Sequence, residues 1–204
     1  MLKDSVSQVR KKPFKDKLLI ILFLLFLIGV LYGGLIAASA SDDVIAKLSG
    51  ITGGFADKRA QQSLLSTFFS SLGSYMLILF ALYILGFSSI SQPLELFVPA
   101  FYGLGIGITM GYIYKTQLFK GVVYCAVLVV PHTVIALTAI VLAAREAFLM
   151  SNLFLGCVFP KLAGELSSET LKLYSVKCVV LSAVILISAV VDCLLTFIFA
   201  GLFV

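Results

Sequence analysis

The chain has 204 residues, of which 61% are hydrophobic and only 12% charged, and its net charge is +5 at pH 7. An ordinary soluble domain has about 45–50% apolar and about 25% charged residues, so this composition excludes a conventional soluble enzyme. The charges stand in groups between long apolar runs, which is the pattern of a polytopic integral membrane protein. The sequence therefore predicts an all-α helix bundle that crosses the bilayer several times.

The apolar runs predict five transmembrane helices. A hydrocarbon core of about 30 Å needs about 20 helical residues. Only the turn-like segment 88–93 separates the second span from the third, so a re-entrant hairpin is the alternative for that pair. The first run ends in Ala38-Ser39-Ala40 and resembles a signal peptide, but it is longer than the about 7–15 apolar residues of such a leader, so an uncleaved anchor is expected. The expected spans are residues 18–40, 72–90, 96–114, 121–144 and 178–203.

Lys and Arg residues orient the predicted bundle. Residues 1–17 form a basic N-terminus, which the positive-inside rule places in the cytoplasm of a cell-membrane protein. Five spans then put ten Lys and Arg residues on the cytoplasmic side and five on the other. Lys115 and Lys120, in the short third connection, argue mildly against this orientation. The basic leader is interpreted as an orientation signal that touches anionic membrane lipid, and no nucleic acid is expected as a partner.

The sequence shows no pattern typical of catalysis or metal binding. Its four cysteines match no metal spacing and imply no disulfide framework. It has a single histidine, and it contains no glycine-rich phosphate loop and no nucleophile–base arrangement. We therefore expect no enzymatic activity, no metal and no cofactor.

Two connections are long enough to have structure of their own. Residues 41–71 are expected outside the cytoplasm as amphipathic helices, which either lie on the membrane surface or present an apolar ledge that grips a partner. Residues 145–177 are expected as a cytoplasmic, interfacial segment broken near Pro160. The candidate partner-binding residues, which we call the ledge, are Phe55, Leu64, Leu65, Phe68 and Phe69.

Glycines recur at four-residue intervals in two of the spans. Gly103, Gly107 and Gly111 line one face of the third span, and Gly29 and Gly33 do the same in the first. Small residues permit the close backbone contact that associates helices in lipid. The two stripes indicate helix packing, either within the bundle or, as the alternative, between copies of the chain in a homo-oligomer.

Two polar residues stand inside the predicted spans. His132 follows Pro131 near the centre of the fourth span, and Asp192 is near the centre of the fifth. An ionised carboxylate at that depth costs at least about 2.5 kcal/mol, so Asp192 needs a partner. Pro131 frees the carbonyl of Val127, to which His132 or Thr133 can supply a donor. We expect His132 and Asp192 to approach one another, either as a structural hydrogen bond or as part of a proton or ion path.

Several of these features together resemble a known family. They are Phe68-Phe69, Ile84-Leu85-Gly86-Phe87-Ser88 followed by Pro93, the glycines of the third span, and Pro131-His132. This pattern is similar to that of the stage II sporulation protein M family. Many members outside sporulation have Glu four residues after the His, where this chain has Ala136. In the last span the family often has Glu where Asp192 stands.

The resemblance implies a non-enzymatic, five-helix membrane scaffold that is required for engulfment during endospore formation. It implies two peptidoglycan-degrading partners, the stage II sporulation proteins D and P, and a location at the sporulation septum and the engulfing membrane. The physical expectation is that residues 44–69 and neighbouring helix faces dock these partners. A small-molecule or ion transporter, or a permease-like component, that uses His132 and Asp192 is the competing interpretation.

Overall fold

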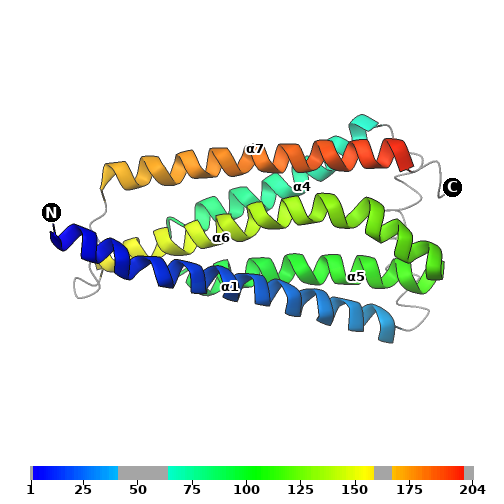
Figure 1. Cartoon of the computed structure of the whole chain (residues 1–204), viewed down its shortest axis with the longest axis horizontal. Coiled ribbons are helices and arrows are strands. Elements are labelled where there is room, and N and C mark those ends of the chain that lie inside the picture. The colour runs from blue at the N-terminus through cyan, green and yellow to red at the C-terminus, as the bar shows by residue number, and fades with distance from the viewer. Residues whose placement is uncertain (1, 41–63, 159–166, 200–204) are drawn as a thin grey trace.

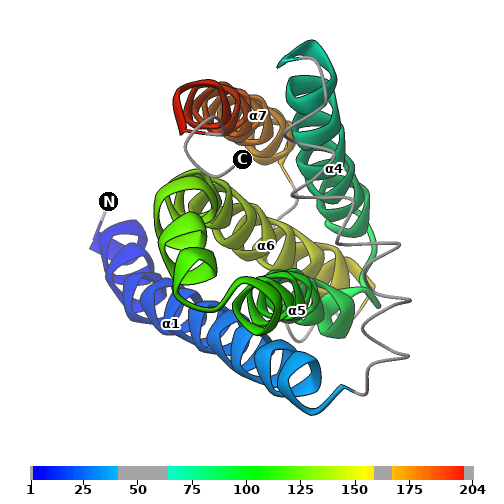
Figure 2. The same ribbon diagram turned by 90° about the vertical axis from the view of Figure 1, so that its right-hand side faces the viewer.

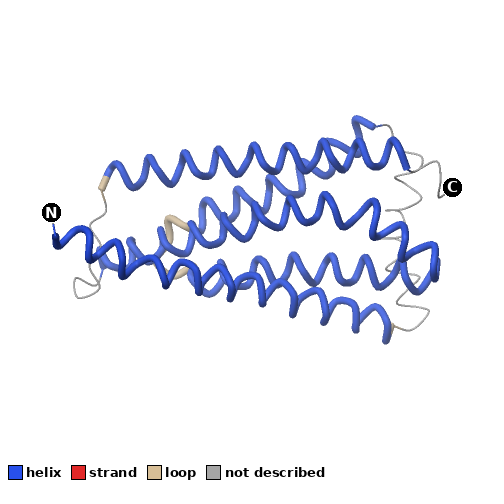
Figure 3. The backbone as a smooth tube through the Cα atoms, viewed as in Figure 1, coloured by secondary structure: helices blue, strands red, loops and turns tan. Residues whose placement is uncertain are grey.

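Five long helices lie side by side in the described chain (Figures 1 and 3). The computed structural model describes residues 2–40, 64–158 and 167–199. Helix α1, with its basic first residues, and helix α7 both begin at one end of the bundle, which we call the basic end; α7 finishes at the opposite end (Figure 1). The elements are α1 Leu2–Ser39, α4 Leu64–Leu85, α5 Gln92–Tyr124, the π-helical turn η2 Cys125–Val129, α6 Val130–Val158 and α7 Ser168–Phe199.

All five helices are long and apolar enough to cross a membrane. The shortest, α4, has 22 residues. Its rise of about 33 Å matches the about 30 Å of a hydrocarbon core. The expected all-α membrane bundle with five spans is confirmed, and the length of α4 favours two full spans over a re-entrant hairpin. The candidate spans are Asp16–Ser39, Phe68–Leu85, Gln92–Lys115, Phe119–Gly156 and Ser168–Phe199.

The helices extend beyond the apolar runs that predict them. Helix α6 continues to Val158 and α7 begins at Ser168, so most of the expected interfacial segment 145–177 is helical, and Pro160 lies outside the described residues. The charged residues near positions 145 and 177 lie inside these helices, where Glu146 of α6 and Lys177 of α7 form an ion pair. Helix α1 likewise begins at Leu2 and includes the basic leader.

Helix α6 is the central helix of the bundle. In Figure 2 it lies between the α1–α5 pair and the α4–α7 pair. Its span is 56% buried, against 17–33% for the other four. Lipid is as apolar as the core, so close packing and polar contacts must supply much of the attraction between helices. The core side chains that meet there include Leu22 of α1, Leu82 of α4, Ile140 of α6 and Ile185 of α7.

Helices α1 and α5 pack together along their glycines, in a contact that we call the glycine seam. A Cβ atom placed on Gly29, Gly33, Gly103 or Gly107 would come within 3.0 Å of a backbone carbonyl group of the other helix. Backbones this close allow Cα–H···O contacts, which recur where helices pack tightly. The carbonyl groups concerned are those of Ala100, Leu104, Phe26 and Val30.

The seam shows where the glycine stripes are used. Gly111 extends it, since a Cβ added there would lie 2.7 Å from the Cβ of Ala37. The stripes of α1 and α5 cover each other within one chain, so these faces are not free to pack against a second copy. Gly105 faces open space instead, because nothing lies within 4 Å of a Cβ added to it.

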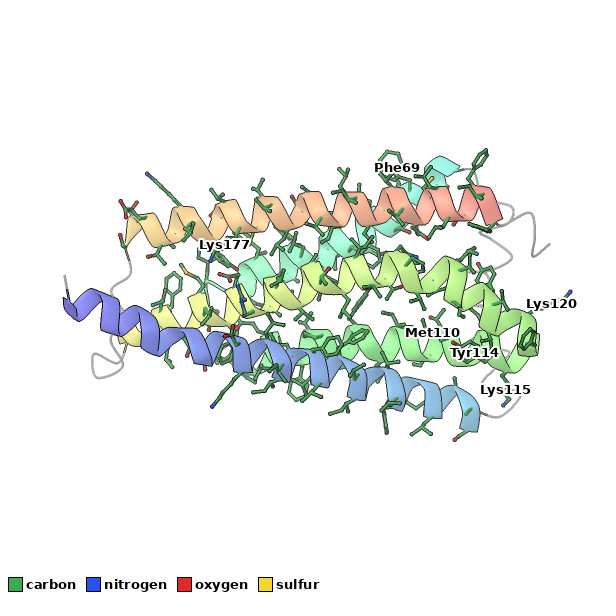
Figure 4. All side chains as sticks on the ribbon, viewed as in Figure 1. Phe69, Met110, Tyr114, Lys115, Lys120 and Lys177 are labelled. Carbon is green, nitrogen blue, oxygen red and sulfur yellow. The ribbon has the colours of Figure 1, made fainter. Side chains whose placement is uncertain are left out.

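The chain reverses direction within α5, between the candidate spans Gln92–Lys115 and Phe119–Gly156, and this reversal closes the opposite end of the bundle (Figure 4). A Cβ added to Gly121 would lie 2.5 Å from the Ile113 carbonyl oxygen, so this close approach requires glycine. The Lys115 ammonium donates a hydrogen bond of 2.7 Å to the Ala40 carbonyl, just past the end of α1. This bond satisfies a carbonyl that the helix end leaves without an intrahelical partner. Lys115 therefore has a structural role at the end of α1.

Candidate functional site

A buried polar cluster joins α4, α6 and α7. His132 of α6 and Asp192 of α7 are 3% and 0% exposed. His132 Nδ1 lies 3.4 Å from Asp192 Oδ1, and Ser71 of α4 donates to Asp192 Oδ2 at 2.5 Å. Ser188 of α7 donates to the backbone carbonyl of His132 at 2.7 Å. The structure thus brings together the two residues that the sequence expects to approach one another, and it adds two serines.

A π-helical turn precedes this cluster in α6. In η2 the Val130 N–H bonds to the Cys125 carbonyl, five residues earlier, and such π turns are frequent at functional sites. His132 Nδ1 lies 2.7 Å from the Leu128 carbonyl oxygen. Because a carbonyl oxygen only accepts hydrogen bonds, this nitrogen carries the proton. The imidazole ring therefore donates a hydrogen bond to the Leu128 carbonyl of the preceding turn. The sequence predicts the neighbouring carbonyl, that of Val127, as the acceptor.

The cluster lies in the half of α7 that is farther from the basic end. Asp192 is about 10 Å along the helix axis from Phe199, the last residue of α7. The whole helix rises about 48 Å, so its centre is well before Asp192. The sequence expects Asp192 near the centre of a span over residues 178–203; because the helix bounds do not place the bilayer along α7, the depth of Asp192 in the membrane stays a prediction.

A second buried cluster, the turn cluster, lies between α4 and α5 on the side of the basic end. Ser91 Oγ is 2.6 Å from the Leu85 carbonyl oxygen and 2.8 Å from both the Ser88 carbonyl oxygen and Glu95 Oε1. Ser151 of α6 donates to the Ser88 carbonyl at 2.6 Å. These hydroxyls satisfy one carbonyl at the end of α4 and one in the turn after it, for which lipid offers no donor.

Glu95 is fully buried in the turn cluster. It stands in the first turn of α5, where the helix dipole stabilises negative charge. Its Oε1 contacts Ser91, whereas its Oε2 has no hydrogen-bond partner among the described residues. An incompletely satisfied carboxyl group in a dry interior marks the turn as a second candidate site. Among the described His, Cys, Asp and Glu residues, no three lie close enough together to hold a metal ion.

Ion pairs tie α6 to α7 beside the turn cluster. Glu146 contacts Lys177 at 2.6 Å and Arg145 at 2.5 Å, and Lys177 lies between the two helices in Figure 4. The Tyr174 hydroxyl of α7 donates to the Tyr83 carbonyl of α4 at 3.1 Å. Helix α7 therefore holds both α6 and the end of α4 at this level of the bundle.

The sequence does not single out Glu95, Ser151 or Glu146. Glu95 stands at the edge of an apolar run and Glu146 just past one, where charged residues are expected to face water. The serine is one of many in the chain, and nothing near it in the sequence shows that it meets a distant turn. One signal does exist: Pro93 and Glu95 together are typical of the first turn of a helix.

The structure describes only part of the ledge. Phe55 lies outside the described residues, and so do the side chains of Leu64 and Leu65, although α4 begins at Leu64. Phe68 is half-buried, Phe69 is 63% exposed, and their ring centroids lie 5.5 Å apart. Phe69 lies at the opposite end of the bundle (Figure 4). Its role in partner binding stays a prediction.

Comparison with known proteins identifies the family of the chain. No curated protein and no solved structure matches it. The family model described as Stage II sporulation protein M matches residues 22–200. That range includes the glycine seam, the His132–Asp192 cluster and the turn cluster. The chain, a multi-pass membrane protein, therefore belongs to the stage II sporulation protein M family.

Proposed function

We propose that the chain is a non-enzymatic membrane scaffold required for engulfment during endospore formation. It recruits the peptidoglycan-degrading stage II sporulation proteins D and P at the sporulation septum and the engulfing membrane. The observation that carries this proposal is the family match over residues 22–200. The architecture supports it, because the described chain consists almost entirely of helices that are long and apolar enough to span a membrane.

The bundle anchors the helices on both sides of the segment that is proposed to bind the partners. Lys115 binds the Ala40 carbonyl at the end of α1. Ser71, near the start of α4, binds Asp192. A binding segment whose ends are fixed loses less conformational entropy when it docks, which improves affinity. In this proposal the segment between α1 and α4, together with the exposed Phe69, contacts the hydrolases, and the N-terminus is in the cytoplasm.

Phe69→Asp is expected to release the partner hydrolases and to leave the bundle folded. Phe69 is 63% exposed, so it contributes little to the core of the chain itself. Removing an aromatic anchor from an interface costs about 2 kcal/mol, or roughly 30-fold in affinity. Co-purification of the two hydrolases with this protein from sporulating cells measures the loss.

Ser70→Asp is the matched control for this prediction. Ser70 is the next residue and is also exposed, so the substitution adds the same charge at nearly the same depth but keeps the phenyl ring. Co-purification with Ser70→Asp should stay close to that of the unaltered protein. If Phe69→Asp retains the hydrolases at normal expression, the ledge is not the docking site.

A transporter or permease-like component is the second candidate function. The observation that favours it is the buried contact of 3.4 Å between His132 and Asp192, next to a π-helical turn. Ionisable residues inside a membrane domain often mark ion or proton paths. Flux in proteoliposomes that disappears in Asp192→Asn would favour transport, whereas co-purification with the hydrolases favours the scaffold.

A further inference from the structure

An apolar groove runs along the outside of the contact between α4 and α7. Its volume is about 280 Å³. Since the two helices are antiparallel, the groove extends from the level of Tyr83 and Ser175, on the side of the basic end, toward the middle of the bundle. The side chains that shape it include Met76, Phe80 and Tyr83 of α4 and Ser175, Cys178 and Ser182 of α7.

The position of the groove selects its occupant. Helices α4 and α7 are both long and apolar enough to span a membrane, and the groove opens outward between them. At this depth the protein is surrounded by hydrocarbon, so the molecules that reach an apolar groove there are the acyl chains of lipids.

The polar groups that line the groove are already bonded within the protein. The hydroxyl groups of Tyr83 and Ser175 bond to each other at 3.2 Å. Ser182 donates to the Val179 carbonyl of its own helix at 2.7 Å. An apolar chain in the groove therefore leaves these groups satisfied. The Tyr83–Ser175 pair makes the end nearer the basic end the polar end of the groove.

A lysine stands beyond this polar end. Lys172 is exposed and lies three residues before Ser175, about one turn of α7 nearer to the basic end. Lys177, in contrast, is paired with Glu146. A cation at this level can contact the phosphate of a lipid whose acyl chain lies in the groove. One lysine near an anionic membrane surface raises the affinity for anionic lipid about fivefold.

We propose that the groove binds one acyl chain of an anionic phospholipid from the leaflet at the basic end. The chain lies between α4 and α7, and the phosphate lies beside Lys172. Bound there, the lipid fills the hollow left by Ser175, Cys178 and Ser182 and completes the packing of α4 against α7.

A phospholipid with a photoactivatable group on its acyl chain tests the site. Full-length protein is reconstituted into phosphatidylcholine vesicles that contain either labelled phosphatidylglycerol or labelled phosphatidylcholine, irradiated, digested and mapped by mass spectrometry. Labels should concentrate on residues 76–83 and 175–182, and they should be about fivefold stronger with phosphatidylglycerol. Labelling no stronger there than at a freely exposed position, such as Leu31 of α1, would overturn the proposal.

Substitutions in and beside the groove test the acyl-chain contact and the phosphate contact separately. Ser182→Phe fills the groove and should abolish labelling there, whereas Val180→Phe, at a residue of the same helix that is 58% exposed, should not. Lys172→Gln should keep the label but remove the preference for phosphatidylglycerol, and Lys120→Gln at the opposite end should change neither. Labelling that survives Ser182→Phe overturns the acyl-chain site, and a preference that survives Lys172→Gln overturns the phosphate contact. If Ser182→Phe does not fold, the map of the unaltered protein decides.

Discussion

Gly107→Ala is expected to separate α1 from α5 and to lower the stability of the bundle by about 1–3 kcal/mol, the usual cost of overpacking. The new methyl group would lie closer than 3.0 Å to the Val30 carbonyl group, and a backbone atom cannot rotate away as a side chain can. Gly103→Ala meets the Phe26 carbonyl in the same way, so the double variant should lose more than either single one. Thermal melting of the purified protein in detergent measures the loss.

Gly105→Ala is the matched control on the same helix. Nothing lies within 4 Å of a Cβ at this position. Alanine is also the better helix former by about 1 kcal/mol, so the melting temperature should stay the same or rise. Equal losses at positions 105 and 107 would indicate a general effect on α5. An unchanged melting temperature for Gly107→Ala would contradict the glycine seam.

Ser71→Ala is expected to destabilise the protein by about 1–3 kcal/mol, the cost of removing a hydrogen bond to a buried acceptor. Ser71 is buried, and its hydroxyl donates to Asp192 Oδ2 at 2.5 Å, which links α4 to α7. In water, solvent would replace the lost donor, but this carboxyl group is 0% exposed. The same melting experiment measures the effect. Ser74→Ala should change little, because Ser74 is exposed and its hydroxyl bonds to the Ser70 carbonyl of its own helix.

A double-mutant cycle shows whether Ser71 and Asp192 act together. When Asp192→Asn is combined with Ser71→Ala, the total loss should differ from the sum of the single losses by about 0.5–3 kcal/mol, because both substitutions alter one interaction. Strict additivity would mean that the two residues do not interact in the folded protein.

Features that repeat within a single helix could be predicted from the sequence. The apolar runs predict five spans, and the four-residue glycine spacing predicts a packing face, because in both cases one stretch of chain contains the whole signal. The contact between His132 and Asp192 was also predictable, since two polar residues in lipid have few other partners to choose from.

Contacts that join distant helices could not be predicted in this way. Ser71 and Ser188 complete the polar cluster, but a serine in a membrane helix equally well bonds to its own backbone, as Ser74 does. The four-residue spacing of the glycines also does not show which helix packs against the glycines of α1. Helix α4 follows α1 in the sequence, yet α5 is the helix that packs against Gly29 and Gly33. Hydropathy likewise does not show that Glu95 contacts Ser91 or that Glu146 pairs with Lys177 of another helix.

During synthesis, α1 enters the membrane long before α5, the helix that covers its glycines. Until α5 is made, α1 must remain stable in lipid although its glycine face has no helix packed against it. Its mean hydropathy of 2.9, the highest of the five spans, makes this possible. Ser71 and His132 also remain without their contact to Asp192 until α7, which follows α4 and α6 in the chain, has been made. Each of these contacts joins an earlier helix to a later one, so the five described helices pack together completely only after α7 has entered the membrane.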